Sequence, residues 1–112
     1  MALNPCKLLP GTLDLMVLGI LAGNDSLHGF GIAREIEKIS GQSILINQGT
    51  IYASLVRLRK IKLIVGVWGH SINNRKAMFY SVTRKGEKHL GSRTKNWDLI
   101  SSTIGRIFQA TR

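Results

Sequence analysis

The feature that most constrains the fold is a pair of strand-like stretches in the second half of the chain. Residues 64–69 (IVGVWG) and 77–82 (AMFYSV) are rich in β-branched and aromatic side chains, which favour extended structure. The segment between them, residues 71–76, is polar and basic, and its adjacent asparagines tolerate left-handed turn conformations. The pattern predicts a β-hairpin with a positively charged tip.

Helical patterns precede this hairpin. Residues 12–23 are apolar on nearly every side and predict a short buried helix. Isoleucines at positions 32, 36 and 39 recur with helical spacing, which predicts a second helix over residues 28–40, capped by His28. The short β-branched stretch 43–46 is compatible with a minor strand.

A third helix is predicted over residues 48–62, capped by Asn47. Ile51, Leu55 and Leu58 form its expected buried stripe. The opposite side is small near the start of the helix and cationic further on, which suits a helix that enters a DNA groove. An ordinary amphipathic surface helix is the alternative. The residues of this side are Gly49, Ala53, Val56, Arg57 and Lys60, flanked by Thr50 and Ser54.

Helices followed by a hairpin with a cationic tip predict a winged helix-turn-helix, a mainly α-helical fold with a small β-hairpin. The third helix is then expected in the major groove of DNA, and the hairpin is expected to reach the neighbouring backbone or minor groove. Within this wing, Arg75 and Lys76 are the expected phosphate contacts.

The last segment predicts a long helix capped by Thr83. Its apolar residues form a heptad-like seam, which packs either on its own domain or on another chain. We expect a homodimer, with a DNA-binding domain in residues 1–83 and a dimerisation helix in residues 84–112. The residues of the predicted dimer interface are Leu90, Trp97, Ile100, Ile104 and Ile107.

The positive charge is concentrated in one part of the chain. Its formal net charge is +10, yet residues 1–40 hold three basic and four acidic residues. Residues 41–97 hold eleven basic residues against Glu87 alone. This asymmetry favours a polyanionic partner, with a merely soluble basic surface as the alternative.

Several other classes of protein are not expected. The longest apolar run contains Asp14 and is too short to cross a bilayer, and no secretory leader opens the chain, so we expect no membrane association and a cytoplasmic protein. The single cysteine, Cys6, and three scattered histidines provide neither a disulfide framework nor metal-ligand spacing. Catalytic and phosphate-loop motifs are absent, so we expect no enzyme, cofactor or metal site.

Four segments of the chain together resemble the PadR-like transcriptional regulators: LPGTLDLMVLGIL, LHGFGI, QGTIYASLVRL and VWGHSINNRKAMFYSVTRKG. The resemblance runs from about Leu9 to Phe108. It implies a dimeric bacterial repressor with an N-terminal winged helix and a C-terminal dimerisation helix. Carried to matching positions, it places at or near the DNA Gln48, Thr50, Tyr52, Ser54 and Arg57, with Asn74, Arg75 and Lys76 as the wing contact.

The sequence departs from the family pattern at three positions. Ala53 stands where a proline is frequent, and Lys62 stands where a glycine usually ends the third helix. Ile72 replaces an acidic wing residue that is common in close relatives, which makes the tip more basic and slightly apolar.

Three aromatic residues need separate interpretation, and two of them have an alternative. The hydroxyl of Tyr52 bonds a phosphate, or Tyr52 lies at the edge of the core. Trp68 is expected to pack between the wing and a helix. Trp97 is expected to be an anchor of the dimer interface. The alternative is a small aromatic effector beside Trp97, which the resemblance implies because some members of the family bind aromatic compounds at this interface.

Three functions remain. A dimeric, sequence-specific DNA-binding transcriptional regulator is favoured. A sequence-independent structural protein that binds nucleic acid is the second, although a wing is less expected there. A winged helix that serves as a protein–protein module is the third, and the charge of residues 41–97 disfavours it.

Overall fold

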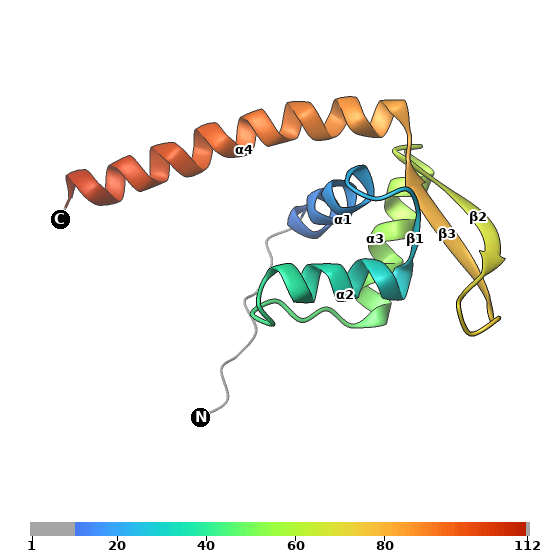
Figure 1. The fold of residues 1–112 in the computed structure, drawn as a ribbon. Helices are drawn as coiled ribbons and strands as arrows, with labels where there is room; N and C mark the ends of the chain where they lie inside the picture. The colour runs from blue at the N-terminus through green and yellow to red at the C-terminus, as the bar shows by residue number, and fades with distance from the viewer. Residues whose placement is uncertain (1–10, 112) are drawn as a thin grey trace.

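The computed structural model describes residues 11–111, so Cys6 lies outside the described residues. Within this range the helices α1, α2 and α3 pack beside a small sheet, and the long α4 passes over α1 and extends beyond it (Figure 1). The elements in chain order are α1 (Thr12–Ala22), β1 (Leu27–His28), α2 (Gly29–Ile39), α3 (Gln48–Lys60), β2 (Ile64–His70), β3 (Lys76–Val82) and α4 (Arg84–Ala110).

Helices α2, α3 and α4 each begin at a side chain that caps their first turn. His28, Asn47 and Thr83 accept a hydrogen bond from the backbone N–H three residues further on, at 2.8–3.0 Å. Such a bond gives a partner to an N–H group that has none within the helix. The caps predicted for these helices are confirmed.

The sheet contains one more strand than the predicted hairpin. Its order within the described residues is β1-β3-β2, with all pairings antiparallel. The additional strand pairs Leu27 with Tyr80 and His28 with Phe79. The strand considered for residues 43–46 is wrong: this segment is a loop. Ile46 is buried there among helices, while β1 occupies the free edge of β3.

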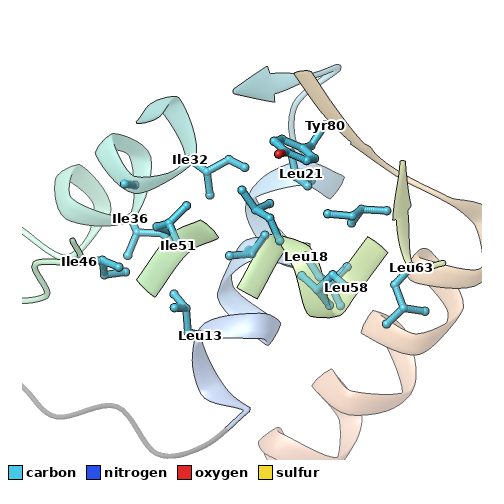
Figure 2. Close-up of a cluster of buried hydrophobic side chains, with 14 residues drawn as sticks. Leu13, Leu18, Leu21, Ile32, Ile36, Ile46, Ile51, Leu58, Leu63 and Tyr80 are labelled. Carbon is cyan, nitrogen blue, oxygen red and sulfur yellow. The ribbon is translucent and has the colours of Figure 1, made fainter. Parts of the chain in front are cut away.

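The core lies between the helices and the inner face of the sheet (Figure 2). Helix α3 contributes Ile51, Leu55 and Leu58, so its predicted buried stripe is confirmed. Tyr80 of β3 closes the core on the side of the sheet. The buried apolar cluster is Leu13, Val17, Leu18, Leu21, Ile32, Ala33, Ile36, Ile46, Ile51, Leu55, Leu58, Leu63, Ile64 and Tyr80.

The end of α3 and the start of α4 meet at a tight joint. Lys62 adopts a left-handed conformation (φ 63°), at the position where the family usually has glycine. The hydroxyl of Thr83 donates to the carbonyl of Lys62 (2.8 Å), and the backbone of Gly86 lies so close to the carbonyl of Leu63 that a Cβ would collide with it. The joint therefore fixes where α4 leaves the winged helix.

Helix α4 confirms the predicted long terminal helix, but most of it lies away from the core. Leu90 still packs against the core of its own chain, whereas every side chain from residue 91 to residue 111 is exposed. None of the helices in the described part of the chain combines the length and apolarity needed to cross a bilayer.

Candidate nucleic-acid interface

The outer face of α3 is exposed over its whole length. Gly49 and Lys60 lie on this face, as predicted. Tyr52 is 63% exposed, so it is a surface residue and does not belong to the core. The hydroxyl of Thr50 donates to the capping side chain of Asn47 at 2.9 Å, which leaves its oxygen lone pairs available to a donor. The exposed predicted residues of this helix are Gln48, Gly49, Thr50, Tyr52, Arg57 and Lys60.

The prediction that Ser54 lies at the DNA-facing surface is wrong. Its side chain is completely buried, and its hydroxyl donates to a carboxylate oxygen of Asp14 at 2.5 Å. Ser54 lies at the border between the two faces of α3, where a helical wheel does not decide burial. Helix α1 packs against this side of α3 and covers it.

Arg57 is exposed but is already bound on one side. Its Nη2 lies 2.8 Å from Oδ1 of Asp14, and its Nε lies 3.1 Å from Oδ2. Burial alone would raise the pKa of Asp14, but hydrogen bonds from Arg57 and Ser54 and the charge of Arg57 outweigh it, so the pKa of Asp14 is lowered. The same pair raises the pKa of Arg57.

The wing tip is an ordered turn. The backbone N–H of Ser71 donates to the carbonyl of Arg75, and the N–H of Asn74 donates to the carbonyl of Ser71, both at 2.9 Å. Asn74 has the left-handed conformation (φ 56°) that asparagine tolerates. The turn holds the side chains of Arg75 and Lys76 at the exposed end of the hairpin.

Trp68 was expected to pack between the wing and a helix, but it does not. It is 61% exposed, and the ammonium group of Lys76 lies 5.0 Å from the centre of its ring. The two residues belong to neighbouring strands, so they hold an aromatic face and a cation together near the wing tip.

A groove of about 490 Å³ separates the start of α3 from the wing. It brings the predicted residues of both elements together, with Tyr52 on one wall and Arg75 and Lys76 on the other. Sequence reasoning missed Phe30 and Trp68 as parts of this groove. An exposed aromatic cannot be told from a core aromatic by type alone, although the basic residues near Trp68 in the sequence were a signal.

A second exposed surface lies along α4. The predicted interface residues Trp97, Ile100, Ile104 and Ile107 are all exposed in the single chain, whereas Leu90 contributes to its own core. A cavity of about 410 Å³ lies between α1 and α4. It is lined by Gly11, Thr12, Leu15, Met16, Arg93, Trp97 and Ile100.

Comparison with known proteins agrees with this geometry. The model of the transcriptional regulator PadR-like family matches residues 17–92. An uncharacterised protein X from Lysinibacillus sphaericus is 29% identical over 94 residues, which cover 84% of this chain and 85% of the relative.

Solved structures share the fold. A PadR-like transcriptional regulator from Bacillus cereus superposes with a TM-score of 0.77 at 27% identity, over 88% of this chain and 93% of that one. A PadR family transcription regulator from Clostridium difficile superposes with a TM-score of 0.76 at 22% identity, over 88% of this chain and 99% of that one. Since the family match spans more than half of the 112 residues, the chain belongs to the PadR-like family of transcriptional regulators.

Proposed function

We propose that the protein is a sequence-specific DNA-binding repressor that acts as a homodimer in the cytoplasm and catalyses no reaction. The observation that carries this proposal is the groove in which the exposed face of α3 and the basic wing tip face each other. In this proposal one element reads bases and another holds the backbone. It is supported by the position of α3 and the wing, which line the same groove.

Each element has a distinct task in this proposal. Helix α3 enters the major groove through its small, exposed first turns, at Gly49 and Ala53, where side chains do not block a close approach. Gln48, Thr50 and Tyr52 offer hydrogen-bonding groups there, and Lys60 meets phosphates at the other end of the helix. Asn74, Arg75 and Lys76 bind the flanking backbone.

The proposed dimer forms through α4, with residues 1–83 as the DNA-binding part. Trp97, Ile100, Ile104 and Ile107 form an apolar seam that the described residues of the single chain leave about half exposed. Pairing of two such seams would bury this surface and place two copies of α3 on successive half-sites of a palindromic operator.

The proposed effector is a small planar aromatic compound. This part is supported by the family resemblance and by the cavity between α1 and α4, which has Trp97 on its wall. The ring of Trp97 would stack on the ligand, and Arg93 lines the same cavity with a cation.

Selection of a binding site from random duplexes, followed by titration at two salt concentrations, tests the proposal. A regulator binds the selected duplex at least about 10³-fold more tightly than random DNA. A structural nucleic-acid binder would bind the selected duplex, random DNA and RNA with similar affinity. A protein–protein module would bind none of them appreciably.

A further inference from the structure

The large apolar side chain with the highest exposed fraction in the described part of the chain is an isoleucine at the wing tip. The side chain of Ile72 is as exposed as in an extended peptide (104%). It occupies the second position of the turn that is closed by the hydrogen bond from the N–H of Asn74 to the carbonyl of Ser71 (2.9 Å). The N–H of Arg75 also donates to the hydroxyl of Ser71 at 3.3 Å, so the turn is fixed from two sides.

Folding does not account for an isoleucine at this position. A side chain that stays fully in water contributes no burial energy, and turn positions favour residues such as Asn, Asp, Gly and Ser. The neighbouring Asn73 and Asn74 fit that preference. Ile72 therefore stands out as an apolar group that a hydrogen-bonded turn presents to solvent at the tip of the hairpin.

The surroundings of Ile72 fit a polyanion. Arg75 and Lys76 follow the turn at the start of β3, His70 precedes it at the end of β2, and residues 63–83 contain no acidic side chain. An apolar side chain flanked by cations is the arrangement with which minor-groove proteins insert a wedge between base pairs while their charges hold the phosphates.

We propose that Ile72 is an apolar wedge that enters the minor groove beside each half-site and partly unstacks one base step. This inference rests on the proposed DNA-binding function. Arg75 and Lys76 hold the wing on the flanking phosphates, and the amide of Asn73 faces the acceptors on the groove floor. Pyrimidine–purine steps such as TA unstack most easily, so the wedge selects the sequence at the flank of the operator.

The test compares Ile72→Ser with the wild type and two controls. Ile72→Leu keeps an apolar group at the tip. Val67→Ser removes another exposed β-branched apolar side chain (66%) from the same hairpin, away from its tip and on the strand face opposite Trp68. Each protein is titrated with the selected operator, in which 2-aminopurine replaces adenine at successive positions of the flank; its fluorescence rises when a base unstacks.

The wild type and Ile72→Leu should raise the fluorescence at one step, and Val67→Ser should do the same. Ile72→Ser should abolish that rise and weaken binding about tenfold, which corresponds to burial of part of an isoleucine side chain. Its salt dependence should equal that of the wild type, because an apolar contact releases no counterions.

Three results would overturn the wedge: unchanged affinity and fluorescence in Ile72→Ser, an equal loss in Val67→Ser, or an altered salt dependence in Ile72→Ser. Failure of the wild type to bind any duplex would instead refute the proposed function, and the wedge with it. The wild-type titration thus separates the two failures.

Discussion

Asp14 of α1 binds Arg57 of α3 through both of its carboxylate oxygens, at 2.8 and 3.1 Å. The same carboxylate accepts a hydrogen bond from the hydroxyl of the buried Ser54. One edge of the guanidinium group is therefore occupied before any DNA arrives. The other three N–H donors of the guanidinium group stay free, so the ion pair fixes the orientation of Arg57 and leaves donors for either a phosphate or a guanine.

Asp14→Ala should destabilise the fold more than Arg57→Ala. Removing the carboxylate leaves the buried hydroxyl of Ser54 without a partner, which costs about 1–3 kcal/mol. Arg57→Ala leaves that hydrogen bond in place and removes only an exposed ion pair, so its cost should be smaller. Urea unfolding of both variants measures the difference, and equal losses would contradict it.

The contribution of Asp14 to stability should depend on pH. Its pKa is lower in the folded chain than the ordinary value of 3.8, so the unfolded chain takes up the proton first as the pH falls. The stabilisation is fully present above the ordinary pKa and is lost as the pH falls through the lowered one. The free energy of unfolding of the wild type should therefore fall relative to that of Asp14→Asn below about pH 4. Urea titrations of both proteins at pH 6 and pH 3 measure this. An equal difference between their free energies of unfolding at the two pH values would contradict the prediction.

Replacing both Arg75 and Lys76 with alanine should weaken binding to all duplexes about equally. Two lost phosphate contacts should reduce the slope of log affinity against log salt by about 2. Lys38→Ala, an exposed cation on α2, is the matched control and should leave the slope unchanged. An unchanged slope in the double variant would show that the wing tip does not touch DNA.

Trp97→Ala should weaken the proposed dimer, because removal of a buried interface aromatic commonly costs about 2 kcal/mol or more. Deletion of residues 96–112 should give a monomer that still folds, since the core lies in the preceding elements. Sedimentation of all three proteins measures this. A wild-type monomer at tens of micromolar would exclude the dimer.

A planar aromatic effector should quench tryptophan fluorescence through Trp97. In a panel of planar compounds, quenching should disappear in Trp97→Phe and persist in Trp68→Phe, because only Trp97 lines the cavity between α1 and α4. Trp68 lies on the wing groove and serves as the internal control. Without any response across the panel, Trp97 would remain a packing residue.

Features that depend on neighbours in the sequence were predictable. Local hydrogen bonding explains the three helix caps, His28, Asn47 and Thr83. Helical periodicity explains the buried stripe of α3. Strands β2 and β3 follow from alternating side chains on either side of a turn.

Features that depend on distant partners were not predictable. The strand β1 is two residues long and exists because β3 offers it a free edge. Ser54 is buried against α1, where Asp14, forty positions away, accepts a hydrogen bond from its hydroxyl. The exposure of Trp68 depends on how far the wing stands from α3, which no local pattern encodes.

The close approach of Gly86 to the carbonyl of Leu63 sets the angle at which α4 leaves the winged helix. Helix α4 is 27 residues long, which corresponds to about 40 Å. A change of about 10° in this angle would move the far end of α4 by about 7 Å, roughly the rise of two base pairs. In the proposed dimer, built on that far end, the lack of a side chain at Gly86 would then set the spacing of the half-sites, and Gly86→Ala would change the preferred operator length without touching DNA.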